Sequence, residues 1–222
     1  METNQDNDAP WAKLRVAVKM AREHCQIWVD GSYYSEKKHK AGTAAIIQGP
    51  DPKDDIALVQ AFNITKLDIR DSKHAELWAA TLALEQMKNF NVERLTTDCP
   101  FVEKRIMEMR KGTLDEEKYN GQLFDRLRAA LDHQPDMELR RVRRDDERIP
   151  LADGFAKSAA KNRTDSFSAR TKMVQAPCIY HKINERGNIA RSTFFYHPDA
   201  PADGVYADFD DDAEHEPSEL GL

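Results

Sequence analysis

Four carboxylates stand where regular elements are expected to begin or end. Asp30 closes an apolar run that starts at Ile27, and Asp98 follows a strand-like segment that ends in two threonines. Glu76 and Asp153 each fall early in a segment with helical periodicity. Taken singly, an acid in the first turn of a helix is an ordinary dipole partner, and an Asp after a strand is an ordinary turn residue. Together, four such acids converging on one side of a sheet would bind divalent cations.

The chemistry that suits such a cluster is metal-assisted hydrolysis. Hard oxygen ligands in an open cluster favour Mg²⁺ or Mn²⁺ over zinc. Neighbouring carboxylates cannot all stay ionised without positive charge, and metal binding removes this repulsion. Two such ions can hold the attacking and leaving oxygens of a phosphodiester. A zinc hydrolase is disfavoured because the seven histidines form no HxxxH or HxH pattern.

The elements that must position these acids follow from the hydrophobic pattern. Strands are predicted at residues 25–34, 41–48, 56–65, 92–97 and 137–142. Helices are predicted at residues 10–23, 72–89, 101–110, 116–132 and 150–161. Three adjacent strands with short connections indicate an antiparallel meander. The order βββ-α-β-α-α-β-α predicts an α/β fold with a mixed five-stranded sheet flanked by helices.

Charge divides the chain unevenly. The net charge of −6 arises in residues 164–222, which hold 11 acids and five bases, whereas the first 163 residues balance to zero. We therefore predict a polar N-terminus with a short helix at 1–24, a globular domain at 25–163 and an appended tail. Within the tail, residues 178–196 have the pattern of a β-hairpin, and the acidic end is expected to be disordered.

Composition excludes several other classes of protein. No apolar run is long enough to span a bilayer, and the polar, acidic N-terminus is unlike a signal or transit peptide. Cys25, Cys99 and Cys178 are isolated, so neither a disulfide framework nor a cysteine zinc site is expected. We expect an intracellular protein, cytoplasmic or nuclear, that does not associate with membranes.

The four acids and their neighbours resemble the motifs of the ribonuclease H family. Asp30-Gly31-Ser32 resembles the first motif, and residues 74–80 (HAELWAA) resemble the helix segment that carries the glutamate. Residues 96–102 (TTDCPFV) are similar to the third motif, in which Thr or Ser precedes the aspartate. Residues 151–156 (LADGFA) are similar to the last. The resemblance extends from about residue 26 to residue 160.

This resemblance implies a ribonuclease H-like fold with a four-carboxylate (DEDD) site. The implied activity is endonucleolytic hydrolysis of the RNA strand of an RNA–DNA hybrid with two Mg²⁺ (or Mn²⁺) ions. Asp30 would bridge the ions, Glu76 and Asp98 would hold one of them, and Asp153 would complete the other. An exonuclease of related fold is disfavoured because that group has Glu where this chain has Ser32.

Departures from the family's pattern concern the substrate. Arg143 stands where the family often has a loop histidine, and Pro100 stands where it commonly has a Gln that contacts RNA. We expect Arg143 or Arg144 to hold substrate phosphate. The full set of expected nucleic-acid-binding residues is Ser32, Lys37, Lys38, Lys73, Arg143 and Arg144.

Two alternatives to catalysis stay open at this point. The chain would be a non-catalytic nucleic-acid-binding module if it keeps the fold without the activity. It would be a protein-interaction module if the tail docks on a protein partner.

Overall fold

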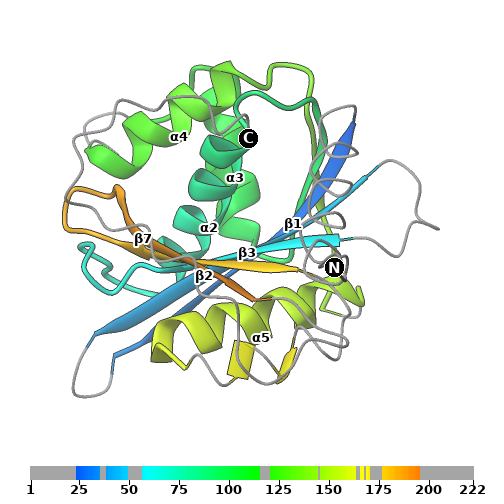
Figure 1. Ribbon diagram of the computed structural model, residues 1–222. Helices are drawn as coiled ribbons and strands as arrows, with labels where there is room; N and C mark the ends of the chain where they lie inside the picture. The colour runs from blue at the N-terminus through cyan, green and yellow to red at the C-terminus, as the bar shows by residue number, and fades with distance from the viewer. Residues whose placement is uncertain are drawn as a thin grey trace, which may run out of the picture.

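A mixed sheet of seven strands forms the centre of the molecule in the computed structural model (Figure 1). The strands are β1 (Cys25–Tyr34), β2 (Lys40–Gln48), β3 (Ala57–Asn63), β4 (Val92–Thr97), β5 (Glu138–Arg141), β6 (Cys178–Ile183) and β7 (Ile189–Phe195). Their spatial order is β5-β4-β1-β2-β3-β6-β7. The pairs β1–β2, β2–β3 and β6–β7 are antiparallel, whereas β1–β4, β4–β5 and β3–β6 are parallel.

The structure describes residues 24–35, 39–49, 57–115, 121–144, 146–163, 166–167, 169–170 and 177–195. The helix predicted at 10–23 therefore lies outside the described residues, as do Lys37, Lys38 and the acidic end of the chain.

Helices cover both faces of the sheet. They are α2 (Ser72–Gln86), α3 (Pro100–Arg110), α4 (Gln122–Asp132) and α5 (Arg148–Lys161). The first three lie on one face and α5 lies on the other (Figure 1). Strand β1 serves both layers because its side chains alternate: Ile27 and Val29 pack beneath α2, whereas Trp28 packs on the α5 side. Within the described part of the chain, no helix has the length and apolar character needed to cross a bilayer.

The central helix α2 begins where the sequence predicts. Asp71 is the N-cap, and its carboxylate accepts a hydrogen bond of 2.9 Å from the His74 amide. From Ala75 to Leu84 nearly every side chain is buried, because the helix is enclosed by the sheet beneath it and by α3 and α4. This enclosure fixes the position of Glu76 relative to the strands.

The predicted α/β class and mixed sheet are confirmed, and the succession βββ-α-β-α-α-β-α is present from β1 to α5. All five predicted strands are present, and the hairpin expected at residues 178–196 adds two more to the same sheet as β6 and β7. Strand β6 pairs with the edge of β3. Burial explains this position, because Cys178, Tyr180 and Phe195 enter the core between the sheet and α5, where Phe167 also packs.

Candidate metal centre

Asp30 and Asp98 are neighbours because of the register of two parallel strands. The β1–β4 ladder ends where Trp28 lies opposite Thr96. Asp30 and Asp98 each follow two residues later, so both carboxylates come from the point where β4 leaves the sheet. The chain then turns at Cys99 into α3, whose first residue is Pro100. The two acids that the sequence places at strand ends thus lie side by side in space.

Glu76 reaches the same point from α2, over an unusually close contact between helix and strand. Its Oε2 accepts a hydrogen bond of 3.0 Å from the Gly31 amide. A side chain at residue 31 would collide with the backbone of Ala75 and Glu76. Glycine in the first motif therefore allows α2 to lie against β1, and its amide orients the glutamate.

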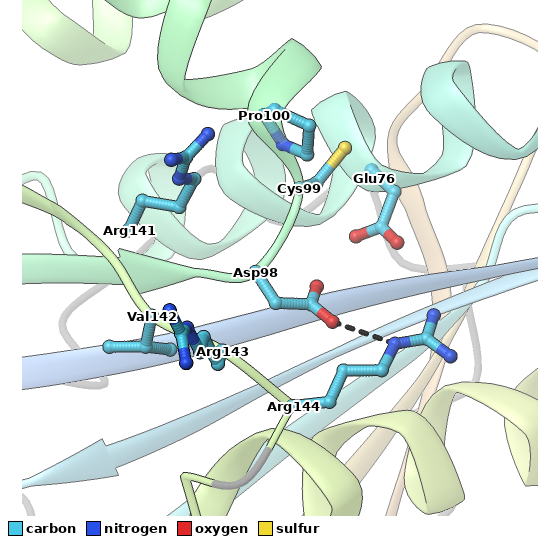
Figure 2. Close-up of a pocket in the computed structure, with 8 residues that line it drawn as sticks. All are labelled: Glu76, Asp98, Cys99, Pro100, Arg141, Val142, Arg143 and Arg144. Atoms are coloured by element: carbon cyan, nitrogen blue, oxygen red, sulfur yellow. Dashed lines mark hydrogen bonds and ion pairs between the residues drawn. The ribbon is translucent and has the colours of Figure 1, made fainter.

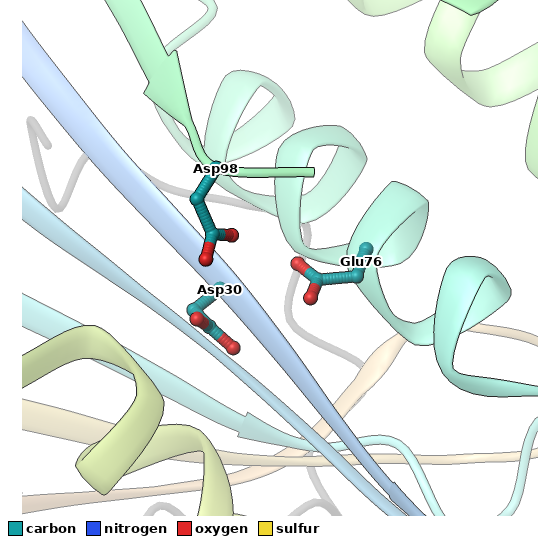
Figure 3. A group of neighbouring side chains, drawn as sticks. All are labelled: Asp30, Glu76 and Asp98. Carbon is teal, nitrogen blue, oxygen red and sulfur yellow. The ribbon is translucent and has the colours of Figure 1, made fainter. Parts of the chain in front are cut away.

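These three carboxylates form a compact group, shown in Figure 3. One oxygen from each of Asp30, Glu76 and Asp98 lies within 4.8 Å of the other two. Asp30 is 3% exposed, and the Asp98 side chain is 7% exposed. The arrangement offers three hard oxygen ligands at a place where anions lose most of their hydration, which fits Mg²⁺ or Mn²⁺.

Electrostatics give the same indication. Burial, followed by the charges of Asp153 and Asp98, raises the pKa of Asp30 to about 8. Burial, followed by the charges of Asp30 and Asp98, raises the pKa of Glu76 to about 9, although the Gly31 amide opposes this shift. The protein alone therefore does not supply enough positive charge to keep the group fully ionised at neutral pH. A divalent cation would supply it.

Asp153 is not a member of this compact group. It lies on α5 with its side chain 36% exposed, and its Oδ2 is 2.6 Å from the Lys157 ammonium. Its charge is still close enough to raise the pKa of Asp30. The structure therefore brings together three of the four predicted acids and leaves the fourth at the margin, paired with a lysine. The sequence contains a signal for this pair, the i,i+4 spacing on one helix, that the motif comparison overlooks.

An open cleft of about 470 Å³ adjoins the acids and is lined on one side by arginines (Figure 2). Arg141, Arg143 and Arg144 come from the end of β5 and the segment after it. The Val142 amide donates to the Thr97 carbonyl at 3.0 Å, so this segment runs beside the end of β4. Arg144 Nε donates to Asp98 Oδ2 at 3.0 Å. Arg143 is exposed in the same cleft, and Pro100 and Cys99 line its other side.

The other predicted nucleic-acid-binding residues are more scattered. Ser32 is buried on β1, two residues beyond Asp30 and opposite Gly42. Lys73 is exposed at the start of α2, with its Nζ 5.9 Å from the centre of the Phe101 ring. The structure therefore brings Arg143 and Arg144 to the acids. Arg141, in the same cleft, is a further cation, and its guanidinium lies 3.4 Å from a carboxylate oxygen of Glu103.

No protein-family model matches this chain, and neither does any curated protein. Solved structures that are similar to it contain ribonuclease H domains. RNase H1 from the halophilic archaeon Halobacterium salinarum NRC-1 is 19% identical, with a TM-score of 0.46, over 63% of this chain and 98% of that one. LC9-RNase H1, a type 1 RNase H with the type 2 active-site motif, is 14% identical, with a TM-score of 0.49, over 64% and 74%.

The foamy viral protease-reverse transcriptase, solved in complex with an RNA/DNA hybrid, is 14% identical with a TM-score of 0.47. That similarity covers 64% of this chain but only 21% of the viral chain. At these identities the likeness concerns the fold alone.

Proposed function

We propose that this chain is a metal-dependent endoribonuclease that hydrolyses the RNA strand of RNA–DNA hybrids. The observation that carries the proposal is the convergence of Asp30, Glu76 and Asp98 beside an arginine-lined cleft. A buried group of acids suits a divalent metal, and neighbouring arginines suit a phosphate backbone. The choice of a hybrid as substrate derives from the motif resemblance described above.

In this proposal each residue has a distinct task. Asp30, Glu76 and Asp98 hold the cations, and Asp153 completes a second site from α5. When bound, the ions would activate water and neutralise charge at the scissile phosphate. Gly31 keeps Glu76 in place through its amide. Arg143 and Arg144 hold the nucleic acid by its phosphates, and Lys73, exposed at the start of α2 outside the cleft, offers a further contact.

Cleavage of a labelled hybrid in Mg²⁺ tests the proposal directly. Asp30→Asn should abolish cleavage, whereas Asp132→Asn, which changes an exposed acid at the end of α4, should leave it unchanged. Parallel assays on duplex DNA, duplex RNA and single strands define the substrate. If no metal-dependent cleavage of any of these nucleic acids occurs, the proposed activity is wrong.

A non-catalytic nucleic-acid-binding module is the second candidate, and one observation favours it. Asp98 and Asp153 already have cationic partners within the protein, Arg144 and Lys157. Such pairs would lower the need for metal. This candidate predicts that hybrid binding, measured without metal, is the same for wild type and Asp98→Asn and that cleavage is absent. In either case binding through phosphates weakens steeply with salt.

A further inference from the structure

The ion pair between Arg144 and Asp98 joins two side chains in very different surroundings. The Arg144 side chain is 86% exposed, whereas that of Asp98 is 7% exposed. Figure 2 shows the arginine extending from the segment after β5, with its guanidinium directed toward the acids. A largely exposed arginine therefore neutralises a buried acid at the position where a metal ion would bind.

The charge of Arg144 acts on the whole group of acids. Arg144 binds Asp98, and one oxygen of each of Asp30 and Glu76 lies within 4.8 Å of an Asp98 oxygen. In this respect it already does part of the work of a metal ion. Two cations close together repel each other, so the guanidinium and a divalent ion would compete for Asp98.

The Arg144 side chain takes no part in the recorded backbone contact of its segment. That contact is the hydrogen bond from the Val142 amide to the Thr97 carbonyl, so it does not have to break when the guanidinium leaves Asp98. The guanidinium binds Asp98 through Nε in a single hydrogen bond, and so lacks the two-pronged geometry of a strong arginine–carboxylate pair. Its planar fork suits a phosphate, and the adjoining cleft already presents Arg141 and Arg143.

We infer that Arg144 is an internal counter-ion that competes with the divalent metal for Asp98, and that metal binding transfers its guanidinium to a phosphate of the nucleic acid. The inference rests on the proposed function for the identity of both ligands. It makes the two binding events cooperative. Metal releases the arginine for phosphate, and by linkage phosphate, by withdrawing the arginine from Asp98, strengthens metal binding to the same extent.

Titration of the protein with Mn²⁺ alone, without nucleic acid, tests the competition. Arg144→Gln should tighten Mn²⁺ binding by about twofold to tenfold, since an exposed ion pair contributes modestly and its charge also repels the ion.

Arg143→Gln is the matched control. It removes an equal charge from the same cleft, and Arg143 has no contact with Asp98 among those the structure records, so a smaller change is expected. Arg144→Lys, which keeps the charge, should stay near wild type. Unchanged or weaker Mn²⁺ binding in Arg144→Gln would overturn the inference, as would equal tightening in Arg143→Gln.

The cooperativity is tested by the affinity for a 2′-O-methyl RNA–DNA hybrid, measured with and without Mn²⁺. Fluorescence anisotropy reports the binding, and a gel checks that the probe stays intact. Metal should tighten hybrid binding in the wild type, and the gain should be smaller in Arg144→Gln. An equal gain in both proteins contradicts the transfer to phosphate. Failure of the proposed function looks different, because a protein with tighter Mn²⁺ binding in Arg144→Gln but no cleavage supports the inference and rejects the enzyme.

Discussion

Lys157 lies one helical turn beyond Asp153 on α5, and its Nζ is 2.6 Å from Asp153 Oδ2. Asp153 therefore has a counter-charge within its own helix, whereas buried Asp30 owes its charge balance to groups on other elements. The fourth acid differs in this way from the compact group of Asp30, Glu76 and Asp98. A metal ion bound by Asp153 must displace Lys157 from that carboxylate. An ion bound by the compact group leaves the pair of Asp153 and Lys157 intact.

The first prediction separates these two kinds of acid. Asp153→Asn should keep one strong Mn²⁺ site, formed by the compact group, and lose a second, weaker one. Asp30→Asn should weaken both, because the charges of Asp98 and of Asp153 both act on Asp30. Binding stoichiometry by calorimetry checks this, with circular dichroism as a control for folding. Equal losses in the two variants would show that Asp153 belongs to the compact group.

The second prediction concerns pH and the stability of the metal-free protein. Folding raises the pKa of Asp30 to about 8 and that of Glu76 to about 9, so the folded state binds more protons than the unfolded state above about pH 4. The free energy of unfolding in EDTA should therefore fall as pH rises from about 4 to about 9, by on the order of a few kcal/mol. Denaturant titrations across this range measure it.

The control for that pH profile is Asp30→Asn, which removes one ionisable carboxylate and puts a side chain of nearly the same shape in its place. Its free energy of unfolding should vary less with pH over the same window than that of the wild type. Added Mg²⁺ should restore stability to the wild type mainly at the alkaline end, where the metal takes the place of protons. A parallel decline in both proteins would contradict the assignment to these acids.

The third prediction has the opposite sign and concerns the added hairpin. His181 on β6 is buried against the Phe62 ring, with centroids 4.7 Å apart, and its Nδ1 lies 2.8 Å from Ser192 Oγ. Burial lowers its pKa to about 4. In the unfolded chain the group takes up a proton near pH 6.5, so its stability contribution is full above that value and is lost as pH falls toward 4.

Replacement by leucine tests this without adding charge. The difference in unfolding free energy between wild type and His181→Leu should change by about 3 kcal/mol at most between pH 6.5 and 4, with the wild type losing more. Differences between variants are the useful quantity, because the acids of the metal centre act in the opposite direction over part of the range. A constant difference across this interval would mean that the histidine takes up its proton equally in both states.

The fourth prediction concerns the close contact of β1 with α2. Gly31→Ala places a methyl group against the backbone of Ala75 and Glu76. We therefore expect the free energy of unfolding to fall by about 1 to 3 kcal/mol and metal binding to weaken. Gly112→Ala is a matched control, since Gly112 has a φ of +63° but open space around it. Gly112→Ala should lower the free energy of unfolding by about 1 kcal/mol through backbone strain alone and leave metal binding unchanged. Calorimetric metal titration distinguishes the two variants.

Most of the strands and helices that position the site can be predicted from the sequence, because the residues that mark them are close together along the chain. The threonines before Asp98 and the cap at Asp71 each mark an element end from neighbouring residues, whereas the apolar run before Asp30 marks β1 itself, which continues to Tyr34. Parallel pairing of β1 with β4 follows from the intervening helix, and it brings the two acids together. The class of fold and three of the four acids were accessible in this way.

The rest depends on contacts between distant segments. Nothing in the alternation of residues 178–183 specifies β3 as the partner strand, since many exposed edges accept a strand of that pattern. Arg144 lies in a run of charged residues that reads as a solvated loop, yet the end of β5 delivers it to Asp98, 46 residues away. Asp153 has the expected position in sequence, but its distance from the group depends on how α5 packs against the sheet.

Because Asp30 and Asp98 lie two residues beyond the paired Trp28 and Thr96, the proposed metal site also depends on the alignment of β1 with β4. A slip of β4 by one residue would bring Thr97 or Cys99 opposite Asp30 and turn the Asp98 carboxylate to the other face of the sheet. The cluster then loses one of its three ligands, although both strands remain hydrogen-bonded. Metal affinity acquired during refolding would therefore time the moment at which β1 and β4, separated in sequence by β2, β3 and α2, first reach their native register.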